Sequence, residues 1–108
     1  MDKQIMKIID KSIVRSHPDI IKLMGCIDGS FTDYKFWTFI FSVNKQIRWK
    51  KYLEVKKEVG TIIKFSGLYD ESMMMDVHFV FEDKNICYRY DRTGIKKKWT
   101  YDKENPAN

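Results

Sequence analysis

The C-terminal segment "NICYRYDRTGIKKKWTY", residues 85–101, alternates apolar and polar residues on both sides of a Thr-Gly pair. This alternation is typical of half-buried β-strands, and a short turn containing glycine between two such runs is typical of a hairpin. A turn at Thr93-Gly94 brings two apolar pairs face to face: Tyr88 with Trp99, and Ile86 with Tyr101. The segment therefore predicts two antiparallel strands at 86–92 and 95–101.

The preceding segments extend this sheet, because a slip of one residue would turn a strand's whole apolar set to the wrong face. Turns at residues 84–85 and 70–72 add strands at 73–82 and 61–69. The first of these turns sets Phe81 against Tyr88 and Phe79 against Tyr90. All three turns agree on one apolar face: Ile63, Phe65, Val77, Phe79, Phe81, Ile86, Tyr88, Tyr90, Ile95, Trp99 and Tyr101. The sequence thus predicts an antiparallel meander in which Trp99 belongs to the core, so that Trp99→Ala would cost about 3–5 kcal/mol of stability.

The N-terminal half predicts helix followed by strand. Isoleucines four apart in residues 2–15 indicate an amphipathic helix, and Pro18 near the start of "IIKLMG" indicates a second short helix that ends at Gly25. One bent helix and two short ones both fit. We expect a loop at 26–30. The segment 31–44 is apolar on both faces, as in a central strand covered on two sides; its faces are Trp37, Phe39, Phe41 and Val43, and Tyr34, Phe36 and Ile40.

The segment at residues 47–59 fits two structures. As a strand it alternates Ile47, Trp49, Leu53 and Val55. As a helix it groups Trp49, Tyr52 and Leu53, is rich in helix formers and stops at Gly60. The alternation favours a strand through about Leu53, and the helix stays open as the alternative.

These elements define a single α+β domain at residues 1–102 and a frayed tail at 103–108. Its N-terminal helix, or two short helices, packs on a twisted antiparallel sheet of about five to six strands that ends in the C-terminal meander. The 108 residues carry 44% hydrophobic residues and a net charge of +5, which fits one folded basic domain. Two cysteines, no signal-peptide pattern and no long apolar stretch favour a cytoplasmic protein without a membrane segment.

The face of the sheet opposite the core carries the charged candidates. The predicted register puts Lys64, His78, Asp91 and Lys96 in one row, with Val80, Arg89 and Lys98 in the next. In the first row, Asp91 and Lys96 form a favourable cross-strand pair. Arg89 opposite Lys98 is an unfavourable like-charge pair, which can mark a site for an anion or can be relieved by flexible side chains in water.

The candidate partner-binding residues form a basic and an acidic group. The basic group is Lys64, Arg89, Lys96 and Lys98; the acidic corner is Asp70, Glu71 and Asp76, with Met74 pointing outward. A single-strand nucleic-acid binder needs rings and cations on one exposed face, and the predicted register assigns Tyr88 and Trp99 to the core. Nucleic acid is therefore the secondary expectation.

Catalytic and metal chemistry find little support in the sequence. His78 beside Asp91 lacks a neighbouring nucleophile, and the predicted register puts no histidine directly opposite Cys87. Two histidines and two cysteines scattered along the chain give no zinc spacing. We expect no cofactor, no metal and no enzymatic activity.

The N-terminal "MDKQIMKIIDKSIV" followed by strands resembles, in size and layout over the whole chain, the immunity proteins of bacterial toxin systems, and most closely those of contact-dependent growth inhibition. The frequent use of Ile, Lys and Asn is similar to that of AT-rich, horizontally transferred genes, among which immunity proteins are common. The resemblance implies a cytosolic bacterial protein that binds one cognate toxin and blocks its active site or the access of its substrate. Immunity proteins against nucleases are often acidic, whereas this chain is basic. We therefore expect a protein-binding module that neutralises a toxin, and the alternative is a small basic RNA- or DNA-binding protein.

Overall fold

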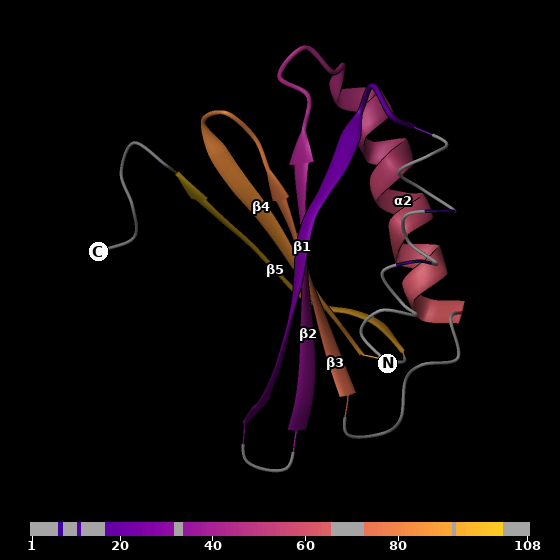
Figure 1. Ribbon diagram of the computed structural model, residues 1–108, viewed down its shortest axis with the longest axis vertical. Coiled ribbons are helices and arrows are strands. Elements are labelled where there is room, and N and C mark those ends of the chain that lie inside the picture. Colours follow the sequence, from indigo (N-terminus) through magenta and orange to yellow (C-terminus); the bar gives the residue numbers. More distant parts are fainter. Residues whose placement is uncertain are drawn as a thin grey trace.

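The computed structural model describes residues 7, 11, 17–31, 34–65, 73–91 and 93–102 of the chain. In this part, one helix packs against one face of a five-stranded sheet whose strand order is β1-β2-β3-β4-β5 (Figure 1). The elements are β1 Ile21–Phe31, β2 Tyr34–Val43, α2 Trp49–Phe65, β3 Met73–Val80, β4 Lys84–Asp91 and β5 Gly94–Asp102. The α+β class and the number of strands agree with the prediction.

The sheet is mixed, and its one parallel pair follows from the position of the helix. β2 and β3 run parallel, whereas the other three neighbouring pairs are antiparallel. Parallel strands need a crossover connection, which α2 supplies. The prediction of a wholly antiparallel sheet is therefore wrong at this pair. The meander at the C-terminal end is present as β3, β4 and β5.

The helix of the described chain follows the first two strands, so the predicted arrangement with an N-terminal helix is wrong for this part. Residues 2–15, apart from positions 7 and 11, lie outside the described residues, as do residues 103–108. The predicted short helix up to Gly25 and the loop at 26–30 are wrong, because both segments belong to β1. A β-bulge between Leu23 and Gly25 interrupts the alternation, which hides the strand pattern in the sequence.

The segment at 47–59 is helical, as the alternative prediction proposed. α2 begins at Trp49 and continues past Gly60 to Phe65, which also replaces the predicted strand at 61–69. Its buried side chains recur at helical spacing: Tyr52, Val55, Val59 and Ile63, each 0% exposed. Trp49 and Leu53, which a strand would bury, are 50% and 40% exposed.

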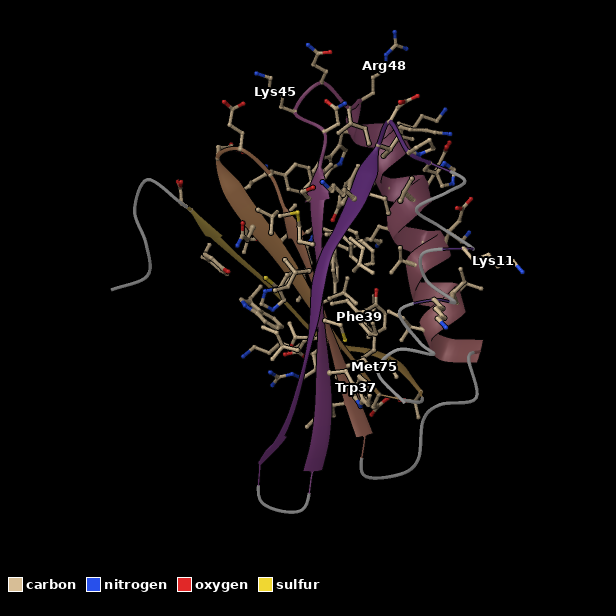
Figure 2. The ribbon with its side chains drawn as sticks, in the orientation of Figure 1. Lys11, Trp37, Phe39, Lys45, Arg48 and Met75 are labelled. Atoms are coloured by element: carbon tan, nitrogen blue, oxygen red, sulfur yellow. The ribbon has the colours of Figure 1, made fainter. Side chains whose placement is uncertain are left out.

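The core lies between the sheet and α2, where Figure 2 shows Trp37, Phe39 and Met75. The predicted inner face of β2 is confirmed: Trp37, Phe39, Phe41 and Val43 are all buried. The prediction that β2 is covered on two sides is not matched in the described chain, because no described helix or strand packs on the face that carries Ile40. We call this second side the open face of the sheet.

The strand register differs from the prediction at two places with different consequences. In β3–β4, Val77 faces Tyr88 and Phe79 faces Ile86, an even shift that keeps every side chain on its predicted face. In β4–β5, a bulge between Arg89 and Tyr90 shifts the pairing by one residue, so that Trp99 faces Cys87. Trp99 and Tyr101 therefore lie on the open face, and Tyr88 lies on the face of α2. The prediction that Trp99 belongs to the core is wrong.

Candidate binding site

The eight predicted binding residues do not form one surface. Asp70 and Glu71 lie outside the described residues, and Lys64 belongs to α2, with a side chain that is also outside the description. Met74 is half-buried in β3. The remaining four lie on three neighbouring strands, but not all on the same face of the sheet: Asp76 on β3, Arg89 on β4, and Lys96 and Lys98 on β5.

The bulge separates the predicted cations. Lys98 faces Tyr88 on the side of α2, whereas Arg89 faces Lys97 on the open face, so the predicted pairing of Arg89 with Lys98 is wrong. Lys96 lies next to the bulge, and its Nζ is 3.6 Å from an Asp91 carboxylate oxygen. This predicted cross-strand ion pair is confirmed.

Arg89 and Asp76 form a two-pronged ion pair on the open face. The Nε and Nη2 groups of Arg89 donate to the two carboxylate oxygens of Asp76 at 2.8 and 2.9 Å. This hydrogen-bonded carboxylate raises the pKa of Arg89 further. Asp76 is only 7% exposed, so it is not part of an accessible acidic corner, and the charge of Arg89 is already balanced. Both residues chiefly stabilise the fold.

The Trp99 ring is surrounded by cations and by a histidine on the same face. The Arg89 guanidinium carbon and the Lys97 Nζ lie 5.5 and 5.4 Å from its centroid. The His78 ring meets it edge-on at 5.8 Å and 89°. The Trp99 ring thus shares one face with cations. Nucleic-acid binding was placed second because the predicted register put Trp99 in the core, and this reason no longer holds. We call Asp76, His78, Cys87, Arg89, Lys97 and Trp99 the open-face cluster.

His78 and Cys87 face each other across β3 and β4, so the predictions that His78 lies beside Asp91 and that Cys87 has no opposing histidine are wrong. Burial, followed by the nearby Asp76 carboxylate, raises the pKa of the Cys87 thiol to about 11. Burial is also the main cause that lowers the pKa of His78. At neutral pH this pair is a neutral thiol beside a neutral imidazole. A reactive cysteine requires the thiolate instead.

The lowered pKa of His78 predicts a specific loss of stability in acid. Its unfolded-state pKa is about 6.5, so below that pH the unfolded chain binds a proton more readily than the folded protein. The contribution of His78 is therefore complete above the unfolded pKa and is lost as the pH falls toward the lower folded value. We expect the stability of His78→Gln to fall less than that of the parent between pH 7.5 and 5.5, as measured by urea unfolding. Equal losses would contradict the assignment.

The two thiols should differ in reactivity. Cys87 is fully buried, whereas Cys26 is half-buried, and a raised pKa leaves little thiolate at Cys87 near pH 8. In Cys26→Ser, the remaining thiol should react with a disulfide reagent such as Ellman's reagent many-fold more slowly in the folded protein than in urea. In the folded protein, the thiol that remains in the matched variant Cys87→Ser should react faster than the thiol that remains in Cys26→Ser. If the two folded variants react at equal rates, Cys87 is in contact with solvent.

A groove between α2 and β5 offers a second kind of surface. It has a volume of about 460 Å³ and is lined by Leu53, Lys56, Lys57, Gly60, Thr61, Tyr90, Gly94 and Ile95. Leu53, on the helix that covers the core, and Ile95, on the edge strand β5, are 40% and 51% exposed. Gly60 keeps this part of the helix close to the sheet, because a Cβ there would lie 3.2 Å from the Tyr90 hydroxyl. We call this feature the α2–β5 groove.

Two lysines converge on one tyrosine beside this groove. The Nζ atoms of Lys56 and Lys98 lie 5.1 and 5.8 Å from the centroid of the Tyr88 ring. Tyr88 and Tyr52 share a hydrogen bond between their hydroxyls at 3.3 Å, and burial raises the pKa of the neighbouring Tyr90 to about 12. Within the described chain, no carboxylate pairs with Lys56, Lys57 or Lys98.

Comparisons with protein families, with curated proteins and with solved structures returned no match. In the described chain, three or more metal-ligating side chains nowhere gather into a possible metal site. None of its helices has both the length and the apolar character that a membrane span requires.

Sequence analysis missed most of the groove because it assigned the segment around Leu53 to a strand. As a helix, Leu53, Lys57 and Gly60 recur at a spacing of three to four residues and share one face. This spacing was the available signal. Ile95 was placed in the core, and its predicted face is correct, but its side chain is 51% exposed where it lines the groove.

Proposed function

We propose that the protein is a non-catalytic module that binds another protein. The α2–β5 groove carries this proposal, since it exposes Leu53 and Ile95 side by side with cations that lack acidic partners in the described chain. Exposed apolar side chains gathered in a hollow and rimmed by polar groups are typical of protein-binding surfaces. The neutral state of the Cys87–His78 pair supports binding rather than nucleophilic catalysis.

Toxin neutralisation is the specific function that we propose within this class. Its support is the resemblance in size and composition to immunity proteins of contact-dependent growth inhibition. A basic chain would then meet an acidic toxin surface, which the lysines of the α2–β5 groove and β5 fit by charge. Such a protein acts in the cytoplasm of the cell that makes it.

Single-stranded nucleic acid is the second candidate partner, and the open-face cluster favours it. Trp99 could stack a base while Lys97 contacts a phosphate. This candidate comes second because Asp76 already balances Arg89. Within the described residues, Lys97 is then the one cation at Trp99 without an acidic partner, which makes a small platform for a strand.

Affinity purification of the tagged chain from its own cells, with and without nuclease treatment, tests the class. We expect one protein in stoichiometric amount that survives nuclease. Co-expression with a toxin gene adjacent to the chain's own gene then tests neutralisation, and restored growth is the expected result. Recovery of nucleic acid alone, with an affinity that falls steeply between low and moderate salt, would overturn the proposal in favour of the second candidate.

A further inference from the structure

We propose that the α2–β5 groove binds a segment of the partner protein in which an apolar side chain is flanked by carboxylates. This inference rests on the proposed protein-binding function and adds the chemistry of the contact. The apolar part of the site is formed by Leu53 from the helix and Ile95 from the edge strand, and Tyr90 also belongs to the lining. A side chain that covers these two residues removes their exposed apolar surface from water, which drives association.

The lysines in and beside the groove favour carboxylates as the charged part of the partner segment. Lys56 and Lys98 share the Tyr88 ring, and Tyr88 lies next to Tyr90, with 6.4 Å between the ring centroids. Lysines elsewhere do have acidic neighbours, since Lys51 pairs with Glu54 at 3.3 Å and Lys96 with Asp91. A ring attracts an ammonium group weakly and leaves its positive charge in place. An incoming carboxylate would relieve the repulsion between the two lysines and gain a charged partner.

Two other occupants fit the groove less well. A second copy of the chain would bring the lysines at positions 96–98 of its own β5 against the same strand, and like charges that meet at an edge oppose pairing. A nucleic acid would need an exposed ring on which to stack a base. Tyr90 in the groove and Tyr88 beside it are buried, at 4% and 3% exposed.

Selection from a random peptide-display library on the immobilised full chain tests the proposal. We expect enrichment of sequences in which a large apolar residue lies between Asp or Glu residues. A synthetic peptide of the enriched sequence should bind Lys98→Gln about two- to fivefold more weakly. It should bind Ile95→Ala about fivefold more weakly, in line with the apolar surface removed. Replacing its acids by amides should weaken binding in the same way.

Matched controls distinguish specific binding in the groove from nonspecific electrostatic and hydrophobic binding elsewhere on the surface. Lys97→Gln changes the adjacent lysine of β5 on the opposite face, and Ile27→Ala changes an isoleucine that is similarly exposed, at 56%, on β1. Both controls should bind the peptide as the parent does, and circular dichroism should show all four variants fully folded at the temperature of the binding measurement. No enrichment, enrichment of basic peptides, or equal binding by Lys98→Gln and Ile95→Ala would overturn the proposal.

The same variants distinguish failure of this inference from failure of the proposed function. If the protein recovered by affinity purification binds Lys98→Gln and Ile95→Ala as tightly as the parent, the groove is the wrong surface and the protein-binding function stands. If the chain recovers nucleic acid and no protein, the function itself is wrong.

Discussion

Phe79→Ala should lower the free energy of unfolding by about 3–5 kcal/mol, the range for large aromatic side chains deleted from a core. Phe79 is 0% exposed in the middle strand of the sheet. Its ring centroid lies 5.7 Å from that of Phe41 on β2, 5.3 Å from Tyr52 on α2 and 6.0 Å from Tyr88 on β4. The truncation therefore opens a cavity where three elements meet, and urea unfolding followed by circular dichroism measures the loss.

Trp99→Ala is the informative control for this prediction. The sequence assigned Trp99 the same cost as a core residue, but the structure places its half-buried ring on the open face. The ring contacts there are mainly with His78, Arg89 and Lys97, and cation–π contacts at exposed sites contribute about 0.5–1 kcal/mol each. We therefore expect a loss of about 1–2 kcal/mol, well below that of Phe79→Ala. Equal losses for the two variants would mean that Trp99 lies in a closed core.

The sequence predicted the fold correctly where a single pattern, the alternation of apolar residues along a strand, determined the structure. In β3 and β4 the apolar residues alternate without interruption, and burial on one face requires that alternation. Val77, Phe79, Ile86, Tyr88 and Tyr90 are accordingly buried together, as predicted. The predicted hairpin register between these strands was wrong, but the predicted faces were still correct, because a shift by an even number of residues keeps each side chain on the same face.

The elements that escaped prediction each combine two signals. In β1, the bulge after Leu23 makes the inward residues Ile21, Leu23 and Cys26 recur unevenly, so the period of a strand is lost. In α2, the apolar alternation around Trp49 and Leu53 overlapped with the helical stripe that begins at Tyr52. The segment is helical because that stripe continues to Ile63 and packs on the sheet. In a strand, the same side chains would not share one face and could not all pack on the core.

A single extra residue in β5 decides which of its side chains lie on the open face and which lie on the side of α2. The bulge opposite Arg89 leaves Ile95 on its predicted face and turns Trp99 to the other side. Three consecutive lysines give no local signal for a bulge, so the sequence could not place Lys97 and Lys98 on their correct faces. The composition of the hairpin as basic and aromatic was evident in advance, but the division of its rings and cations between two surfaces required the backbone.

Arg89→Ala should cost about 3 kcal/mol of unfolding free energy, because removal of one partner leaves a buried charge without compensation. The partner left behind is Asp76, whose side chain is 10% exposed, whereas that of Arg89 is 39% exposed. Partial access of water to Arg89 places the expected loss at the lower end of the range for buried pairs. Urea unfolding at neutral pH measures it.

Two further variants show whether this loss comes from the stranded carboxylate. Lys96→Ala removes an ion pair of the same charge type, which joins β5 to β4 where the Arg89–Asp76 pair joins β4 to β3. Its side chains are 52% and 30% exposed, so the expected loss is at most about 1 kcal/mol. The double variant Asp76→Ala/Arg89→Ala removes the stranded charge together with its partner and should be more stable than Arg89→Ala alone. A double variant that is less stable than Arg89→Ala would show that the aliphatic part of Asp76 or its backbone contacts, rather than the ion pair, stabilise this face of the sheet.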